Sequence, residues 1–246
     1  MKSVKSRPVP RLYLAQGLRQ GAEVALSEAA RAHSAALRLK SGDPVRLFDG
    51  SGGEYTALLL QAGREMRALV GEFRDFECES PLSITLAQCL SSGDRMDITL
   101  QKATELGVRA IQPLQSTRSI VRLDAERMAR RQVHWQNVVR SACEQCGRNS
   151  VPVVAPTADI ENWLASTPKE GARLMLAPDA HAGLKQINPD GPITLLVGPE
   201  GGLSPEEQAM AQAAGFTGVR LGPRVLRTET APLAALAALQ AIWGDL

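Results

Sequence analysis

The chain has 246 residues, of which 44% are hydrophobic and 22% charged, the composition of a globular protein. It has no run of about 18 apolar residues and no hydrophobic signal segment at its start, so we expect a cytoplasmic protein without a membrane span. The net charge is +2, but residues 1–72 and 109–150 are basic, whereas 73–108 and 151–246 are acidic. A basic stretch is typical of a phosphate-binding face or of a solvated helix surface.

Residues 1–72 are predicted to form a small β-rich domain. The expected helix and strands are 26–39, 45–49, 54–61 and 66–73. A glycine-rich turn at 49–53 separates the first two strands. The polar segment 74–81 ends in a proline and is expected to be a linker.

From residue 73 to residue 246 strands and helices alternate, which is typical of a mostly parallel α/β sheet. The expected strands are 82–90, 110–114, 174–177, 193–197 and 219–221, and the expected helices are 94–106, 124–146, 159–165 and 233–243. Asp94 is placed to cap the first of these helices. Ser204 and Glu207 form a Ser-x-x-Glu capping box for a further helix that ends at Gly215.

Two glycine-containing segments follow the last two strands. They are Gly198-Pro-Glu-Gly-Gly202 and Gly222–Pro232. Ligands of α/β sheets lie beyond the carboxyl ends of the strands, so we expect a ligand site where these segments meet. No phosphate-binding glycine pattern is present, and Glu200 suits a cationic ligand group better. For the first segment, a plain connecting turn is the alternative.

Motifs spread over nearly the whole chain resemble those of the ribosomal RNA small subunit methyltransferase E family, of the SPOUT superfamily. They are Arg11-Leu-Tyr, Leu47-Phe-Asp-Gly50, Met96-Asp-x-x-x-Gln-Lys-Ala-Thr-Glu-Leu-Gly107, Cys143-Glu-Gln-Cys-Gly-Arg148, Gly198-Pro-Glu-Gly-Gly202 and Leu221-Gly-Pro-Arg-Val-Leu-Arg-Thr-Glu-Thr230. The resemblance implies a PUA-like β-barrel RNA-binding domain at 1–72. It also implies a SPOUT α/β methyltransferase domain at 73–246 with a C-terminal deep trefoil knot.

The same resemblance implies S-adenosylmethionine as cofactor, a homodimer, and 16S rRNA of the small ribosomal subunit as partner. The implied reaction is methylation of N3 of uridine 1498. Two alternatives stay open: a SPOUT enzyme that methylates another RNA base, and a noncatalytic RNA-binding protein of ribosome assembly. The intact glycine segments argue against the second, because a binding protein needs no methyl donor.

The residues expected to enclose the cofactor lie at strand ends and on the two segments. They are Leu176, Leu196, Val197, Gly198, Glu200, Gly201, Gly202, Leu221, Gly222, Val225, Leu226 and Thr228. Uracil N3 carries a proton at neutral pH, so a general base is needed, and Glu200 and Glu229 are the candidates. Arg227 is expected to stabilise negative charge on the uracil carbonyl oxygens. Glu229 is equally explained as a carboxylate at a helix N-terminus.

The expected RNA surface draws on both basic stretches. Its residues are Arg7, Arg11, Arg38, Lys40, Arg118, Arg122, Glu144, Gln145 and Arg148. The cluster of Arg127, Arg130 and Arg131 is interpreted as a solvated helix face. No metal site is expected, because Cys143-x-x-Cys146 lacks a second Cys or His pair at zinc-ligand spacing; the two cysteines are expected to pack.

Overall fold

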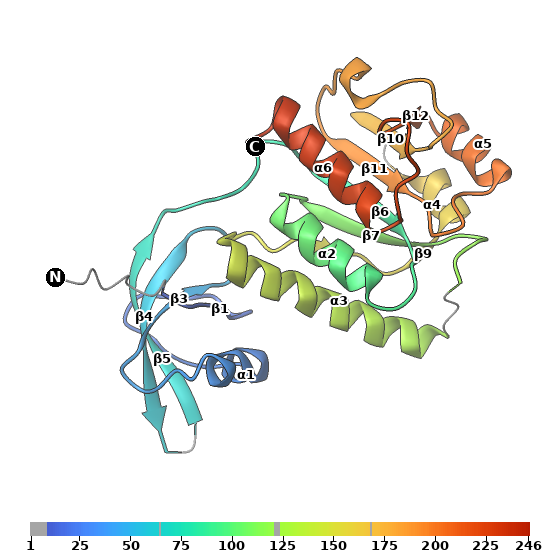
Figure 1. Ribbon diagram of the computed structural model, residues 1–246. Helices are drawn as coiled ribbons and strands as arrows, with labels where there is room; N and C mark the ends of the chain where they lie inside the picture. The colour runs from blue at the N-terminus through green and yellow to red at the C-terminus, as the bar shows by residue number, and fades with distance from the viewer. Residues whose placement is uncertain (1–8, 64, 121–123, 168) are drawn as a thin grey trace. The chain divides into compact units, whose positions relative to one another are not determined.

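The computed structural model describes residues 9–63, 65–120, 124–167 and 169–246. The chain forms two compact units, which Figure 1 shows in sequence colours. Unit 1 comprises the chain up to Glu79 together with Cys143–Val151, and unit 2 comprises Ser80–Ala142 with Pro152–Leu246. The expected boundary lies after residue 72, whereas unit 1 continues to Glu79 and also includes Cys143–Val151. A strand runs across the expected boundary, from Glu65 to Arg74.

Unit 1 is built on a five-stranded sheet with the order β1-β3-β4-β5-β2. Its elements are β1 (Arg11–Tyr13), β2 (Glu23–Ala25), α1 (Glu28–Ala36), β3 (Pro44–Phe48), β4 (Glu54–Ala62) and β5 (Glu65–Arg74). β1 pairs with β3 in parallel, and the other pairs are antiparallel. The sequence analysis missed β1 and β2, because three residues are too few to show an alternating pattern. Aliphatic side chains such as Leu12, Leu47 and Leu59 form the core.

Unit 2 contains a seven-stranded sheet with the order β12-β10-β11-β6-β7-β8, in which β9 also pairs with β7. Its elements are β6 (Ile84–Cys89), α2 (Arg95–Glu105), β7 (Ala110–Gln115), α3 (Ala125–Cys146), β8 (Val153–Val154), β9 (Ala158–Asp159), α4 (Ile160–Ser166), β10 (Ala172–Leu176), η1 (Leu184–Gln186), β11 (Ile193–Val197), α5 (Pro205–Ala213), β12 (Thr217–Val219) and α6 (Thr230–Trp243). The strand pairs are parallel, so the predicted parallel α/β sheet is confirmed.

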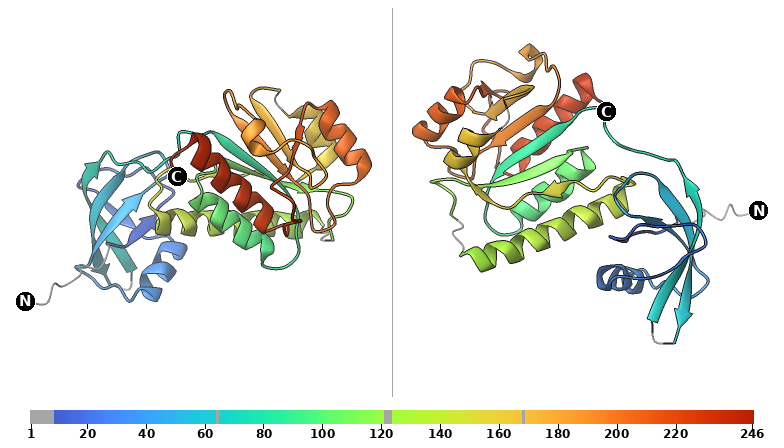
Figure 2. Two further views of the ribbon diagram at one scale, coloured as in Figure 1. Left: turned by 45° about the horizontal axis from the view of Figure 1, so that its top comes forward. Right: turned by 180° about the vertical axis from the view of Figure 1, so that it is seen from behind.

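Helices cover both faces of the unit 2 sheet, as Figure 2 shows from two further sides. α4 and α5 pack on one face, where Ile160, Leu164 and Phe216 belong to the same buried cluster as the strand residues Met175 and Leu196. On the other face α2 and α6 contact each other, and α6 contacts β11. Among the described residues, no helix has the length and apolar character that crossing a membrane requires.

Two helix starts differ from the sequence-based expectation. Asp94 stands at the N-cap of α2, but its backbone is helical and its side chain makes no capping hydrogen bond, so the predicted cap is wrong. α6 begins at Thr230 instead of residue 233, with Pro232 inside its first turn. Proline is tolerated there because first-turn N–H groups have no helical acceptor.

The predicted capping box at α5 is confirmed. The Ser204 hydroxyl accepts from Glu207 N at 3.1 Å, and the Glu207 carboxylate accepts from Ser204 N at 2.8 Å. Glu207 is buried and also accepts from Thr117 N at 2.7 Å. This carboxylate therefore joins the start of α5 to the loop that follows β7.

Replacing Glu207 by alanine is expected to lower the free energy of unfolding by about 2–4 kcal/mol, because two enclosed backbone N–H groups lose a charged acceptor. Urea denaturation measures this. The matched control is Glu161→Ala, which removes an exposed first-turn glutamate of α4. Equal stability of the two variants would show that the Glu207 contacts contribute nothing.

Candidate functional site

The carboxyl ends of β10, β11 and β12 border one pocket of about 580 Å³ in unit 2. This volume lies within the roughly 300–1,000 Å³ of small-molecule sites. Three segments supply most of the wall: 176–178 after β10, 197–203 after β11, and the chain from 219 to 231 after β12. The two glycine segments therefore meet at one site, as the sequence analysis expected.

The residues predicted to enclose a ligand line this pocket, with the exception of Leu196. The side chain of Leu196 is fully buried in the core that α4 and α5 cover, so it does not line the pocket. Successive side chains of a strand point to opposite faces, and its neighbour Val197 reaches the pocket instead.

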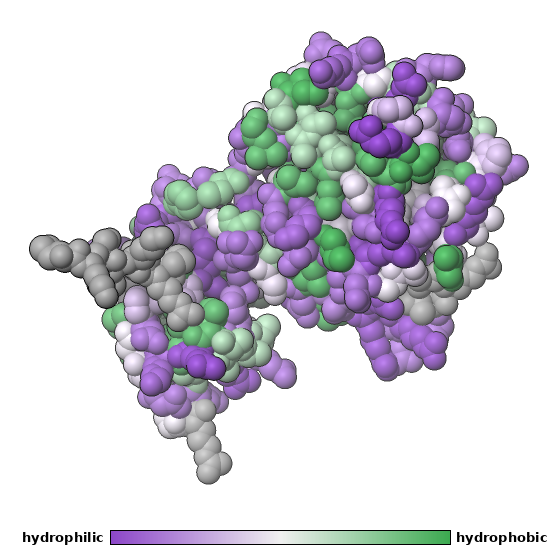
Figure 3. Space-filling view, viewed as in Figure 1, coloured by the Kyte–Doolittle hydropathy of each residue, from purple (hydrophilic) through white to green (hydrophobic). Residues whose placement is uncertain are grey.

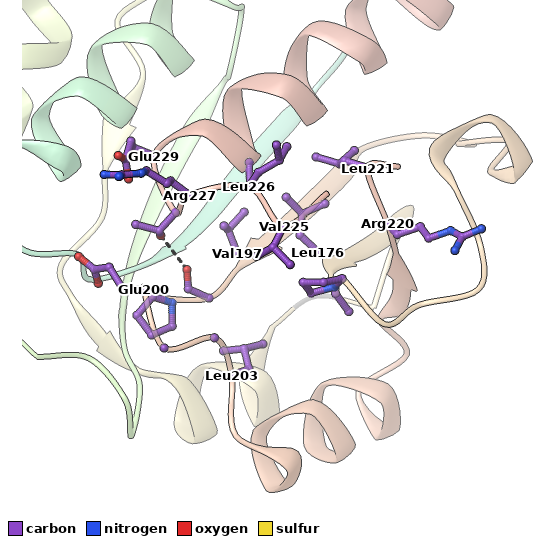
Figure 4. Close-up of a pocket in the computed structure, with 18 of the residues that line it drawn as sticks. Leu176, Val197, Glu200, Leu203, Arg220, Leu221, Val225, Leu226, Arg227 and Glu229 are labelled. Carbon is purple, nitrogen blue, oxygen red and sulfur yellow. Dashed lines mark hydrogen bonds between the residues drawn. The ribbon is translucent and has the colours of Figure 1, made fainter. Parts of the chain in front are cut away.

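The pocket has a charged end, and beyond it apolar side chains together with the exposed Arg220 and Arg224 form the wall. Figure 4 shows Glu200, Arg227 and Glu229 together at one end, with Leu176 and Leu221 toward the other. Val225 lines the pocket while 80% of its surface is exposed. A largely apolar site with a few convergent polar groups is typical of a pocket for a small organic ligand.

The first glycine segment folds tightly back on itself. Gly202 N donates to Pro199 O at 2.9 Å. A Cβ on Gly198 would lie 3.0 Å from Leu203 N and 3.2 Å from the carbonyl carbon of Gly202. The side chain of Arg118 braces the segment, because its Nη1 donates to Gly201 O at 3.0 Å. A side chain at residue 198 would therefore require the backbone of this corner to move.

Thr228 ties the two segments together. Its hydroxyl donates to Gly198 O at 2.9 Å, the dashed line in Figure 4, and accepts from Gln88 Nε2 at 3.4 Å. Thr228 is buried, and its hydroxyl is occupied on both sides. The residue therefore positions the two segments of the pocket wall relative to each other.

Glu200 is held by α2 and by the residues before it. Its Oε1 accepts from Ser92 N at 2.9 Å, from the Ser92 hydroxyl at 3.0 Å and from Arg95 Nη1 at 2.8 Å. Partial burial would raise the pKa of Glu200, but the hydrogen bonds from Ser92 and Arg95 outweigh it and hold the pKa below its ordinary value. Glu200 is therefore a charged anchor.

Glu229 and Arg227 differ from Glu200 in having few protein contacts. Glu229 is the N-cap of α6 without a side-chain capping bond, and its Oε2 lies 3.7 Å from Arg95 Nε. That oxygen is enclosed and makes no hydrogen bond within the described part of the chain. Arg227 is exposed at the pocket rim.

Arg95 is a pocket residue that the sequence analysis missed. It stands at the start of α2, beyond the carboxyl end of β6, and reaches both glutamates. β6 pairs with β11, so the start of α2 lies at the same edge of the sheet as the first glycine segment. The rule that ligands lie beyond strand ends, applied to β6, would have identified this residue.

Some of the residues predicted to bind RNA are exposed, and others are not. Arg38, Lys40 and Gln145 are exposed in unit 1. Arg118 is exposed in unit 2, but its guanidinium also donates to the glycine segment. Arg7 and Arg122 lie outside the described residues.

The predicted solvated helix face is confirmed for two of its three arginines. Arg127 is exposed and paired with Asp124, and Arg130 is exposed and paired with Glu126. Arg131 is half-buried.

Three residues expected to face RNA are turned inward in unit 1, and this part of the prediction is wrong. Arg148 is buried and its guanidinium binds Glu79, with Nη2 at 2.6 Å from Oε2. Arg11 Nη2 donates to Asn149 Oδ1 at 2.6 Å, and Glu144 accepts from Tyr13 N at 2.9 Å. Burial raises the pKa of Glu144, which also contacts His33 at 2.8 Å. These contacts lie within unit 1, to which the end of α3 belongs.

The cysteines are predicted to differ sharply in reactivity. Burial raises the pKa of Cys89 and Cys143 to about 12, so thiolate is scarce at pH 8. Burial also raises the pKa of Cys78, but its side chain is exposed. Iodoacetamide at pH 8 is expected to label Cys78 at least about 100-fold faster than the two buried thiols. Peptide mass spectrometry measures this; similar rates would show that Cys143 is not packed as described.

Comparison with known proteins finds relatives over nearly the whole chain. A family described as RNA methyltransferase domain matches residues 78–240. Ribosomal RNA small subunit methyltransferase E from Buchnera aphidicola is 32% identical over 97% of this chain and 98% of its own. The crystal structure of a Ribosomal RNA small subunit methyltransferase E from Neisseria gonorrhoeae, bound to S-adenosyl methionine, is 45% identical with a TM-score of 0.90, covering 97% of this chain and 99% of that one. A Legionella pneumophila structure with bound cofactor SAM is 37% identical, with a TM-score of 0.93 and the same coverage.

Proposed function

Because the chain belongs to the ribosomal RNA small subunit methyltransferase E family, we propose that it is a cytoplasmic enzyme that methylates N3 of uridine 1498 in 16S rRNA of the small ribosomal subunit. The methyl donor is S-adenosylmethionine. The observation that carries the proposal is that both glycine segments line the same pocket. In addition, 97% of this chain matches a relative whose structure was solved with this cofactor.

The pocket suits S-adenosylmethionine in its volume and in the chemistry of its lining residues. Leu176, Val197, Leu221 and Leu226 supply apolar walls for the adenosine part, and the tight turn at Gly198 keeps the backbone of this corner compact beside them. The remaining proposed contacts are Glu200, Gly201, Gly202, Gly222, Val225 and, through its position, Thr228. The cofactor supplies a methyl group activated by a positively charged sulfur. Carboxylates at one end of the pocket complement that charge.

The chain has to orient the uracil and remove its N3 proton. Arg227 is exposed at the charged end and has no ion pair among the described residues, so its guanidinium is available to the uracil carbonyl oxygens. Glu200 and Glu229 are the carboxylates at that end, and one of them is proposed as the proton acceptor. Methyl transfer further requires that the base be held in line with the methyl group, which the rigid strand ends favour.

We also propose a PUA-like β-barrel for unit 1, a deep trefoil knot in unit 2, and a homodimer. The knot is proposed from the family to which the chain belongs, and the close contact of residue 228 with Gly198 is compatible with it. The homodimer is supported by α6, whose apolar side chains stay partly exposed, including Ile242. Figure 3 shows hydrophobic side chains gathered over this helix.

The RNA surface that remains on unit 1 leads to a prediction about salt. Replacing Arg38 and Lys40 together by alanine is expected to weaken small-subunit RNA binding and to reduce the slope of log affinity against log salt by about 1–2, because two exposed cations leave the phosphate contacts. Filter binding at several salt concentrations measures this. An unchanged slope would show that Arg38 and Lys40 make no phosphate contacts with the RNA.

Isothermal titration with S-adenosylmethionine tests the cofactor assignment. We expect saturable binding by the unmodified chain. Absence of both binding heat and a thermal shift would instead favour a noncatalytic RNA-binding protein with this fold.

A further inference from the structure

The charged end of the pocket holds two carboxylates and one arginine that are not equivalent. We infer that Glu229 accepts the N3 proton and that Arg95 positions Glu229, with Glu200 as the anchor of Arg95. This division of roles rests on the proposed function. It depends on three differences between the carboxylates: their hydrogen bonds, their position on the chain and their relation to Arg95.

Glu200 is unsuited to accept a proton. Three donors converge on its Oε1, two from Ser92 and one from Arg95, at 2.8–3.0 Å. Hydrogen bonds to the charged form of a carboxylate stabilise that form and make it a weaker base. Protonation of Glu200 would also weaken its contact with Arg95, which links α2 to the first glycine segment.

Glu229 is free of such bonds. Its carboxylate accepts no hydrogen bond from the described residues, and only 21% of the side chain is exposed. A glutamate at a helix N-cap would ordinarily bind the first amides of the helix, but the helical backbone at this position leaves the side chain uncapped. The same residue lines the pocket. A carboxylate that caps no helix amide and accepts no hydrogen bond from the described residues is available to a ligand, although Arg95 lies near it.

Arg95 joins the two carboxylates. Its Nη1 lies 2.8 Å from Glu200 Oε1, and its Nε lies 3.7 Å from Glu229 Oε2. The planar guanidinium can face two acceptors from different atoms at once, whereas a lysine presents one point charge. Because Glu200 fixes the guanidinium, Glu229 is held at the pocket wall by an ion pair instead of by a short hydrogen bond.

The proposed reaction combines a proton transfer to Glu229 with a methyl transfer to N3. The N3–H proton moves to a carboxylate oxygen of Glu229. N3 uses the electron pair that held this proton to bond the methyl carbon, while the bond from that carbon to sulfur breaks and its electron pair stays on sulfur. Glu229 afterwards releases its proton to water. Arg95 touches none of the reacting atoms and acts through Glu229.

Single-turnover methylation of small-subunit RNA by wild type, Glu229→Gln, Glu200→Gln and the exposed control Glu161→Gln tests the assignment. Wild type must first yield N3-methyluridine; another product would overturn the proposed function itself. Given that product, Glu229→Gln is expected to lower the rate at pH 7 about 100-fold or more. Its affinity for S-adenosylmethionine should stay within about threefold, and its rate should rise about tenfold per pH unit toward pH 9 as uracil loses the proton without help.

A Glu229→Gln rate within threefold of wild type at pH 7, with the wild-type pH profile, would overturn the inference while leaving the proposed function intact. A pH-dependent defect confined to Glu200→Gln would also overturn it. For Arg95→Ala we expect kcat to fall about tenfold or more with the KM for cofactor nearly unchanged, and Arg95→Lys to restore part of the loss. If Arg95→Ala impairs kcat and the KM for cofactor to the same extent, and Arg95→Lys restores neither, Arg95 only stabilises the fold and does not position Glu229.

Discussion

Replacing Gly198 by valine is expected to raise the Kd for S-adenosylmethionine about 100-fold or more, which corresponds to about 2.7 kcal/mol of binding free energy. A Cβ at this position would lie 3.0 Å from Leu203 N and 3.3 Å from Gly202 Cα. The nearest atoms belong to the backbone of the same corner and to no flexible side chain, so the corner has to open. Isothermal titration measures the affinity.

Gly17→Val is the matched control, because a Cβ on Gly17 meets no heavy atom within 4 Å. It should bind the cofactor as wild type does. Circular dichroism and thermal denaturation show whether both variants keep their fold. Wild-type affinity in folded Gly198→Val would contradict the placement of the cofactor in this corner.

Replacing Arg227 by alanine is expected to lower the rate of methyl transfer by about 100- to 1,000-fold, the effect of removing one donor from a developing negative charge. The guanidinium is exposed and has no ion pair among the described residues, so its loss should cost little stability. Cofactor affinity is expected to change little, since Arg227 lies with Glu229 at the charged end of the pocket and is proposed to face the uracil.

The control for Arg227 is Arg127→Ala, which removes an exposed arginine on α3 that is paired with Asp124. Single-turnover rates at saturating cofactor and RNA separate catalysis from binding. If Arg227→Ala reacts as fast as this control, stabilisation of the uracil oxygens by Arg227 is excluded. If its rate recovers fully at higher RNA concentration, the residue binds RNA without contributing to the chemical step.

The sequence predicted the sheet of unit 2 well because each of its longer strands is a short apolar run followed by a turn signal. Strand 193–197 was predicted with its observed bounds, and the capping box at Ser204 fixed the start of the next helix. The pocket could be predicted for the same reason: strand ends and glycine segments are local features, and parallel strands bring their carboxyl ends to one edge.

What the sequence did not reveal depends on contacts between residues far apart in the chain. Arg11 and Arg148 are separated by 137 positions, and both were expected to face RNA because an arginine in a basic stretch ordinarily does. Their partners Glu54 and Glu79 lie elsewhere in the sequence and turn them inward. Arg95 was missed for the opposite reason, since nothing in its own segment shows that two distant carboxylates converge on it.

Mass spectrometry of 16S rRNA from cells that lack the gene tests the central claim most directly. We predict the loss of one N3-methyluridine at position 1498, its return with the wild-type gene, and no return with the Arg227→Ala gene. A methylation map that is unchanged by loss of the gene, or that loses a methyl group at another base, would contradict the proposed function.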